Sequence, residues 1–338
     1  MSESATVKPD TIAPERAAAR RRYGLLIVAV ALVGATLPLW TASMPFALML
    51  ASHAVLAAIV ALSLDLLMGN TGLLSFGHAA WYGFGAYVTG LASKYLTGEM
   101  LILLPLTVVA AALLATVIGF ILVRQIGKAF AILTLALSQI MFAFVFVMSD
   151  ITGGEDGLQG IPVPTAFGVS VVRPDVWYLI LYGVLLLALL MTFHVRRSPL
   201  GKSWLAIREN TERARFVGMN VGFLKLLAYV VSASLAALAG GLFVLFNGAA
   251  SPDMLHWFES GKILMYVVLG GVGTIIGPVL GAAVFTVAEH YVSSLTSAWL
   301  IYFGGFFVLI VIVAPGGIFG VLSNLWTRTT MRQARIAS

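Results

Sequence analysis

Long apolar runs recur along the whole chain and are separated by short polar stretches. A helix crosses the hydrocarbon core of a bilayer with about 20 apolar residues. Runs of this kind occupy residues 24–40, 46–68, 72–92, 101–123, 129–149, 177–195, 223–247 and 298–314. The alternating pattern of a membrane β-barrel is absent from these runs, so they predict transmembrane helices, in which the backbone groups hydrogen-bond to one another.

A further apolar region, 260–292, is too long for a single span and contains a cluster of helix-breaking residues. The breaks are Gly270, Gly271, Gly273, Gly277 and Pro278. Dividing the region into 260–273 and 275–292 gives ten membrane segments and brings both ends of the chain to the same side. The first run, preceded by arginines, also has features of a signal peptide. We expect an uncleaved first span, because no convincing small-residue cleavage site follows it.

The composition supports this interpretation. Hydrophobic residues make up 60% of the 338 residues and charged residues only 10%, whereas soluble domains contain about 25% charged residues. The sequence therefore predicts an all-α polytopic membrane protein of about ten membrane-embedded helices, without a soluble domain. The absence of cysteine excludes disulfides and thiol chemistry.

The distribution of charge predicts the orientation. Four regions hold 17 of the 20 Lys and Arg residues, and they are the N-terminal tail, the 124–128 turn, the 196–225 region and the C-terminal tail. The positive-inside rule places all four in the cytoplasm. We expect a cytoplasmic tail at 1–22, a transmembrane domain at 23–322 and a second cytoplasmic tail at 323–338. The 150–176 loop carries Asp150, Glu155, Asp156 and Asp175 and is expected outside.

The segment 69–87, GNTGLLSFGHAAWYGFGAY, combines small and polar residues within an apolar run. At helical spacing one face carries Ala79, Gly83, Ala86 and Gly90. Small residues let membrane helices approach closely, so this face is expected to pack in the bundle.

Polar side chains gather at the start of the same segment and just before it. Asn70, Thr71, Ser75 and His78 are candidates for a solute path, or for hydrogen bonds between helices. Asp65 lies within the preceding run. A carboxylate in hydrocarbon is costly and is therefore a candidate functional group, unless it lies at the level of the lipid headgroups.

The longest predicted cytoplasmic feature is 203–218, SWLAIRENTERARFVG. Ser203 suits a helix N-cap and Gly218 a helix end. On a helix Trp204 and Ile207 share an apolar stripe with Thr211 and Ala214. The charged side contains Arg208, Glu209, Glu212, Arg213 and Arg215. Such a helix lies against the protein and presents its charges to a partner, or it is a solvated connector.

Motifs for nucleotide, metal and catalytic chemistry are missing from the sequence. The GKS at 201–203 lacks the other glycine of a P-loop and follows a membrane helix rather than a strand. The five histidines do not have metal-ligand spacing. We therefore expect no enzyme activity, no cofactor, no metal site and no nucleic-acid partner.

Several ordered stretches carry a family resemblance. They are LSLDLLMGNTGLLSFGHAAWYGFGAY, TGGEDGLQGIP, RRSPLGKSWLAIRENTERARFVGMNV with KLLAYVVSASLAALAGGL, LGGVGTIIGPVLGAA and APGGIFG. Together they make the chain resemble the permease subunits of branched-chain amino-acid ABC importers, of the LivM type. Two positions depart from the family pattern, since the family tends to have asparagine at Asp65 and often glutamine at Leu73.

The resemblance implies one half of a membrane pore in the bacterial inner membrane. Its partners would be a second permease of the LivH type, two cytosolic ATPase subunits and an extracytoplasmic solute-binding protein. The 196–222 loop would hold the helix that couples to the ATPases, with Trp204, Ile207, Arg208, Glu209, Glu212, Arg213 and Gly218. The solute stays open among branched-chain amino acids, urea, short amides and aromatic acids. The alternative function is an autonomous secondary transporter or channel, which would need intramembrane ion ligands.

Overall fold

The computed structural model describes residues 34–40, 44–125, 127–296, 298, 301–305, 308, 312 and 316–320. Among them, five helices are long and apolar enough to cross a membrane. They are α2 (Pro45–Thr71), α4 (Met100–Leu122), α5 (Lys128–Val147), α7 (Pro174–Arg197) and α10 (Val221–Asn247). The predicted all-α membrane class is confirmed. The count of ten segments stays a prediction, because most of 24–40 and 298–314 lies outside the described residues.

Three further helices pack with these five, namely α3 (His78–Tyr95), α11 (Trp257–Gly270) and α12 (Gly277–Leu295). The predicted division of the long apolar region is confirmed, since residues 271–276 separate α11 from α12. Gly271 and Gly273 adopt positive φ angles there, a conformation that glycine reaches without strain.

Short elements connect the long helices. Between α5 and α7 lie α6 (Ser149–Thr152), the 3-10 helix η2 (Gly154–Asp156) and an antiparallel hairpin of β1 (Thr165–Ala166) and β2 (Val169–Ser170). Between α7 and α10 lie α8 (Pro199–Glu209) and α9 (Thr211–Phe216), and the 3-10 helix η3 (Pro252–Leu255) precedes α11.

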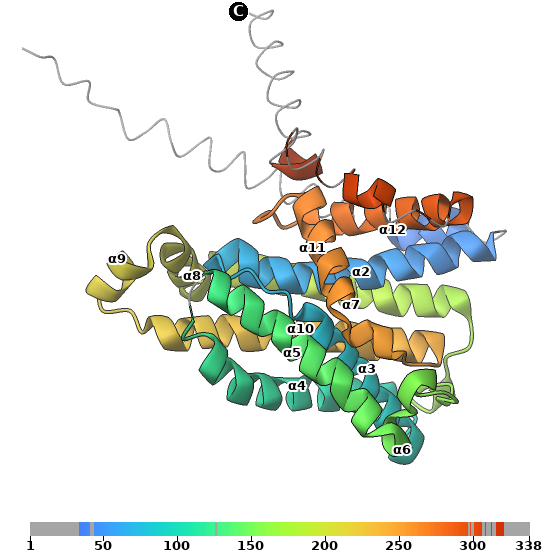
Figure 1. Ribbon diagram of the computed structural model, residues 1–338. Coiled ribbons are helices and arrows are strands. Elements are labelled where there is room, and N and C mark those ends of the chain that lie inside the picture. The colour runs from blue at the N-terminus through green and yellow to red at the C-terminus, as the bar shows by residue number, and fades with distance from the viewer. Residues whose placement is uncertain are drawn as a thin grey trace, which may run out of the picture.

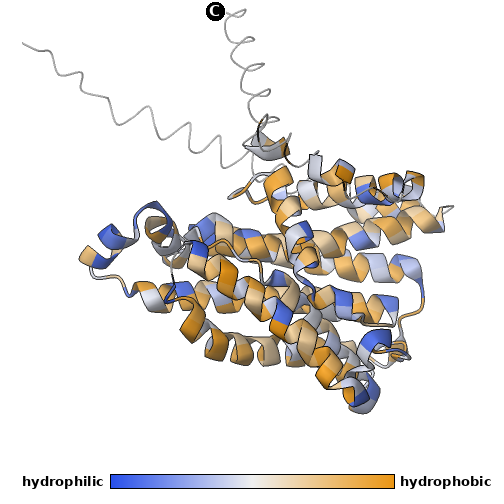
Figure 2. Ribbon diagram, viewed as in Figure 1, coloured by the Kyte–Doolittle hydropathy of each residue, from blue (hydrophilic) through white to orange (hydrophobic). Residues whose placement is uncertain are grey.

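Helix α2 forms the centre of the bundle. It packs against α7, α10, α11 and α12, and Figure 1 shows it extending alongside α7 and α10. By contrast, α4 exposes Leu113, Val117 and Ile121. An exposed apolar helix face suits contact with lipid, and Figure 2 shows mainly apolar helices between two more polar ends.

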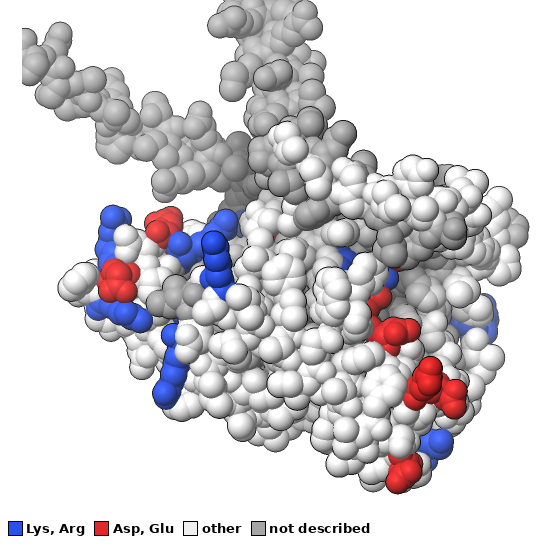
Figure 3. All heavy atoms as spheres, in the orientation of Figure 1, with Lys and Arg blue, Asp and Glu red and all other residues white. Residues whose placement is uncertain are grey.

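The charges define the two ends of the bundle. Lys and Arg gather mainly at the end that holds α8 and α9 (Figure 3), which we call the basic end. Its basic residues are Arg124, Lys128, Arg196, Arg197, Lys202, Arg208, Arg213, Arg215 and Lys225. The opposite end holds the β hairpin, η2 and η3.

The predicted span 72–92 is wrong at its start, because residues 72–77 are not helical. Gly72, with φ +75°, ends α2, and α3 begins only at His78. Thr134 of α5 accepts a hydrogen bond from Phe76 N at 3.1 Å, and Ser75 accepts one from Gly77 N at 3.2 Å. Irregular backbone at membrane depth is tolerated where protein groups bind it. Gly69, Asn70 and Thr71 thus form the last turn of α2, and residues 72–77 form an irregular, mostly buried connection to α3.

Candidate functional site

The segment between α7 and α10 is anchored to the basic end by apolar and polar contacts. Trp204 of α8 is fully buried, and its Nε1–H donates to the Leu224 carbonyl of α10 at 2.8 Å. Ile207, Ala214 and Val221 form a small separate apolar cluster. The Arg208 guanidinium donates to the Gly69 carbonyl near the end of α2. The stripe expected from the sequence thus does face the protein.

This segment differs from a single helix over 203–218. Asn210 adopts an extended conformation, ends α8 and caps α9 by accepting from Arg213 N at 2.8 Å. Helix α8 begins earlier than expected, with Ser198 rather than Ser203 as its N-cap. Gly218 follows α9 with φ +84°, as its predicted role as a helix end requires.

The break changes the ion pairs on the segment. In one continuous helix Glu209 and Arg213 would be four residues apart on the same face and could form an ion pair. They lie on different helices, so this spacing no longer brings them together. The ion pair found among the described residues of α8 and α9 joins Arg215 to Glu212 at 3.0 Å. Glu209, Glu212 and Arg213 are exposed. Arg208 differs from them, because its guanidinium is bound to α2.

An exposed apolar tip was missed by sequence reasoning. Phe216 at the end of α9 is 90% exposed and Val217 is 68% exposed. The sequence did contain a signal for this tip, because Phe216 is an aromatic residue directly after the basic residues Arg213 and Arg215. The tip projects at the end of the molecule where α9 lies in Figure 1.

Asp65 connects three parts of the basic end. Its carboxylate is fully buried and accepts from Arg196 Nη2 at 2.5 Å and from Gly273 N at 2.7 Å. Arg196, at the end of α7, also donates to the Gly273 carbonyl at 2.8 Å. We call Asp65, Arg196 and Gly273 the basic-end clasp. It joins α2 and α7 to the turn between α11 and α12 and encloses Asp65 in protein. A role of Asp65 in the solute path, or a place at the level of the lipid headgroups, stays a prediction.

The polar residues expected near a solute path hydrogen-bond within the bundle. The side chains of Asn70 and Thr71 donate to carbonyls one turn earlier in α2, at 2.9 and 2.7 Å. His78 contacts Ser75 Oγ through Nδ1 at 3.1 Å and Ser232 Oγ of α10 through Nε2 at 2.8 Å.

The hydrogen-bond order fixes the histidine tautomer. Ser232 donates its proton to the Ser63 carbonyl at 2.5 Å, so it accepts from His78 Nε2–H, and Nδ1 accepts from Ser75. The bonds join the buried connection to α2 and α10. A role of these residues in translocation stays a prediction, and none of them lines either pocket described below.

The small-residue face of α3 lies in tight contacts. A Cβ on Gly83 would lie 2.4 Å from Leu255 Cγ, and one on Gly90 would lie 2.7 Å from Leu158 Cδ2. Ala79 and Ala86 are also fully buried. Gly85 makes a tighter contact with backbone, because a Cβ there would lie 2.0 Å from the Ala237 carbonyl oxygen of α10. Gly85 was not part of the small-residue face predicted from the sequence.

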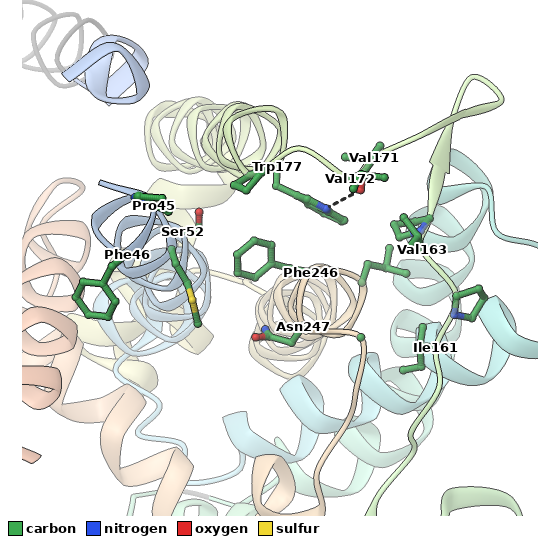
Figure 4. A pocket seen from close by; sticks show the side chains of 16 residues that line it. Pro45, Phe46, Ser52, Ile161, Val163, Val171, Val172, Trp177, Phe246 and Asn247 are labelled. Atoms are coloured by element: carbon green, nitrogen blue, oxygen red, sulfur yellow. Dashed lines mark hydrogen bonds between the residues drawn. The ribbon is translucent and has the colours of Figure 1, made fainter. Parts of the chain in front are cut away.

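A cavity of about 490 Å³ opens at the opposite end, between the starts of α2 and α7 and the end of α10. We call it the outer pocket. Figure 4 shows Trp177, Phe246 and Val163 around it. Trp177 Nε1–H donates to the Val171 carbonyl at 3.0 Å, and Ser52 and Asn247 contribute hydroxyl and amide groups to the lining. The outer pocket is therefore mostly apolar.

The hairpin beside the outer pocket is held by Glu99, the residue before α4. Its carboxylate accepts from Thr165 Oγ1 at 2.6 Å and from the amides of Phe167 and Gly168 at 2.5 and 3.3 Å. These bonds favour the ionised form, the Thr165 bond most strongly, and lower the pKa of Glu99.

A second cavity, of about 220 Å³, lies deeper along α2. It contains an ion cluster that the sequence analysis missed. Lys262 Nζ of α11 contacts Glu259 Oε1 at 2.9 Å and Glu289 Oε1 of α12 at 3.1 Å. We call this cavity the charged pocket. The signal was available, because an acid and a base three residues apart at the start of an apolar helix share one face.

Comparison with known proteins identifies relatives among membrane transport permeases. Residues 46–315 match the family model described as the permease component of the branched-chain amino acid transport system. The high-affinity branched-chain amino acid transport permease LivM of Salmonella typhimurium is 30% identical over 80% of this chain and 69% of its own length. LivM of Escherichia coli K12 is 31% identical over 77% of this chain and 67% of its own length.

A third relative shows that the likeness extends to permease proteins of the LivH type. The LivH protein of Escherichia coli K12 is 24% identical over 78% of this chain and 91% of its own length. No solved structure matches the chain significantly. The apolar helices, the anchored basic segment and the family match over residues 46–315 lead to one conclusion: the chain belongs to the permease components of branched-chain amino acid transport systems, and is a membrane transport subunit rather than an enzyme.

Proposed function

We propose that this chain is one of two permease subunits of an ATP-driven, binding-protein-dependent ABC importer, and that it carries branched-chain amino acids or related small polar solutes. It lies in the bacterial inner membrane with both termini in the cytoplasm. The transmembrane domain is 23–322, and the basic end is cytoplasmic. The other subunits are a permease of the LivH type, two ATPase subunits and an extracytoplasmic solute-binding protein.

The observation that carries this proposal is the construction of α8 and α9. One side of the segment is held against the bundle by Trp204, Ile207 and Arg208. The other side exposes charges and the apolar tip Phe216–Val217. Aromatic side chains that fill a partner's pocket dominate many protein interfaces. A solvated connector would have little need of a nearly fully exposed phenylalanine, so this surface supports docking to the ATPase subunits.

The outer pocket supports the solute class. Its aliphatic and aromatic lining suits an apolar side chain, because burial of apolar surface is favourable by about 25 cal/mol per Å². It lies at the end expected to receive solute from the binding protein. The alternative of an autonomous transporter differs in one respect, since it would move solute without ATPase subunits.

The test uses the complete complex in proteoliposomes. Phe216→Ala is compared with Phe167→Ala, which removes a phenylalanine that is 87% exposed on the β hairpin at the opposite end. Phe216→Ala should weaken ATPase association at least tenfold and abolish ATP-dependent uptake, while Phe167→Ala leaves association unchanged. Glu209→Ala and Arg213→Ala should give smaller losses in association than Phe216→Ala.

Two results would contradict the proposal. Unchanged ATPase association in Phe216→Ala, Glu209→Ala and Arg213→Ala together would reduce α8–α9 to a connector. Solute flux through the permease without ATPase subunits would favour the autonomous transporter.

A further inference from the structure

The charged pocket contains more hydrogen-bonding capacity than its own residues use. Lys262 contacts one oxygen of each carboxylate. Within the described residues the other oxygen, Oε2, of Glu259 and of Glu289 has no recorded partner. Lys262 also has three donor hydrogens and only these two contacts. The side chains of Glu259, Lys262 and Glu289 are 27%, 17% and 21% exposed, so the cluster is partly accessible.

Hydroxyl groups around the cluster are also unsatisfied. Thr286 Oγ1 is buried without a hydrogen-bond partner. The hydroxyls of Tyr82 and Tyr266, which also line the pocket, make no recorded hydrogen bond within the described part of the chain. The buried Thr286 hydroxyl costs free energy for as long as it lacks a partner. Unpaired groups from α3, α11 and α12 therefore surround one small cavity.

The available groups are complementary to a zwitterion. The free carboxylate oxygens can accept from an ammonium group, while Lys262 and the hydroxyls can donate to a carboxylate. The rest of the wall is apolar and includes Leu56, Val60 and Phe243. A volume of about 220 Å³ is below the roughly 300–1,000 Å³ of pockets for drug-sized ligands, so the cavity suits a small solute.

We propose that the charged pocket is a transient binding site for an α-amino acid with an apolar side chain. The ammonium group binds between Glu259 and Glu289, the carboxylate binds Lys262, and the side chain lies against the apolar wall. The inference rests on the proposed function and specifies where the solute binds within this subunit.

The outer pocket provides the approach. It is lined by Pro45, Phe46, Met49 and Ser52 of α2, and the charged pocket by His53, Leu56, Ala57 and Val60. Consecutive turns of one helix thus line the two cavities in sequence.

A polar contact between His53 and Asn247 lies between the two cavities. His53 Nε2 is 3.3 Å from Asn247 Oδ1, and the imidazole ring packs edge-on against Phe243 and Phe246. His53 lines the charged pocket and Asn247 the outer pocket. A solute that passes from one to the other must displace this contact.

The experiment uses a reporter cysteine in the cysteine-free chain, within the complete complex in nanodiscs. Ala57→Cys places a thiol on the wall of the charged pocket, and its modification by a methanethiosulfonate reagent is followed by the intact mass of this chain. Leucine should slow modification at least fivefold. The analogues 4-methylpentanoate, without the amino group, and 3-methylbutylamine, without the carboxylate, should not protect at the same concentration.

A second variant tests the charges. In Ala57→Cys chains that also carry Glu289→Gln, half-protection should need at least ten times more leucine. Glu155→Gln, an exposed acid outside the pocket, is the matched control and should leave protection unchanged. Met254→Cys, at a lining position to which no solute contact is assigned, serves as the reporter if Ala57→Cys prevents assembly.

The outcomes separate the two proposals. Unprotected cysteines, or equal protection by both analogues, overturn the zwitterion site whether or not the complex transports. Solute flux through the permease without ATPase subunits contradicts the proposed function, while leucine protection of the cysteine in the complete complex still supports the site.

Discussion

Removal of the Asp65 carboxylate tests whether the basic-end clasp stabilises the bundle. The side chain is fully buried and accepts two hydrogen bonds, from Arg196 at 2.5 Å and from Gly273 N at 2.7 Å. Bonds to charged groups contribute about 1.5–3 kcal/mol each, and loss of one partner of a buried ion pair costs about 3–5 kcal/mol. Arg196 keeps its bond to the Gly273 carbonyl, and 14% of its side chain is exposed. We therefore expect Asp65→Ala to cost roughly 3 kcal/mol, the lower end of that range.

Asp65→Asn has nearly the same shape and separates charge from hydrogen bonding. Asparagine has one acceptor oxygen where aspartate has two, so one of the two accepted bonds is lost. We expect a cost of about 1–2 kcal/mol, between those of the native chain and Asp65→Ala. Asp175→Ala is the control, because its pair with Arg173 is exposed and such pairs contribute about 0–1 kcal/mol.

The assay is equilibrium unfolding of the purified permease in mixed micelles, extended to a double-mutant cycle. Asp65→Ala leaves Arg196 without its counter-ion, whereas Asp65→Ala with Arg196→Met removes both charges. The double variant should be more stable than Asp65→Ala alone, because an unpaired buried charge costs more than an apolar replacement of the pair. Additive losses, or an Asp65→Ala chain as stable as Asp175→Ala, would refute the reasoning.

Three further predictions concern packing, the hairpin and topology. Gly85→Ala places a Cβ 2.0 Å from the Ala237 carbonyl oxygen and should prevent assembly of a monodisperse complex. Gly183→Ala in α7 meets open space and should be tolerated. Equal yields of the two variants would contradict the tight packing at Gly85. The lowered pKa of Glu99 means that the hairpin is stabilised above the ordinary carboxyl pKa of 4.5 and loses this stabilisation as pH falls below it. The protection factors for hydrogen exchange at residues 165–170, which correct for the intrinsic pH dependence of exchange, should therefore fall at acidic pH in the native chain and lose this pH dependence in Glu99→Gln. Finally, an impermeant thiol reagent applied outside should label Asp150→Cys but not Lys202→Cys, and labelling of Lys202→Cys would overturn the orientation.

The sequence predicted the helices well because hydrophobic length carries that information directly. The expected run 223–247 differs from α10 by only two residues at its start. The same pattern failed at residues 72–77 because hydropathy does not distinguish a helix from irregular backbone buried in protein. The acceptor for Phe76 N is Thr134 of α5. A partner on another helix leaves no periodic pattern within residues 72–77, so the sequence does not indicate this hydrogen bond.

The candidate sites were harder to predict because they depend on contacts between distant segments. Nothing local to Asp65 shows that Arg196, 131 residues away, neutralises it. Glu259 was overlooked because the expected span began at residue 260, just beyond it. The amphipathic pattern predicted a helix against the protein at 203–218, and its docking role stays a proposal. The break at Asn210 was not predicted, because asparagine occurs both inside helices and at N-caps and does not by itself indicate an interruption.

Helix α11 connects the proposed docking surface with the proposed solute site. Its start carries Glu259 and Lys262, and its end leads into Gly273 of the basic-end clasp. Fourteen residues of α-helix span about 21 Å and move as a rigid unit. We expect a displacement of α8 to act through Arg196 at the end of α7 and through Gly273 on α11, and thereby to change the distance between Lys262 and Glu289 of α12. If so, ATP should alter the modification rate of Ala57→Cys in the native complex, and Asp65→Ala should abolish this response while leucine still protects the cysteine without ATP. An ATP response that survives in Asp65→Ala would exclude this route, because the clasp is then not the connection through which α8 moves α11.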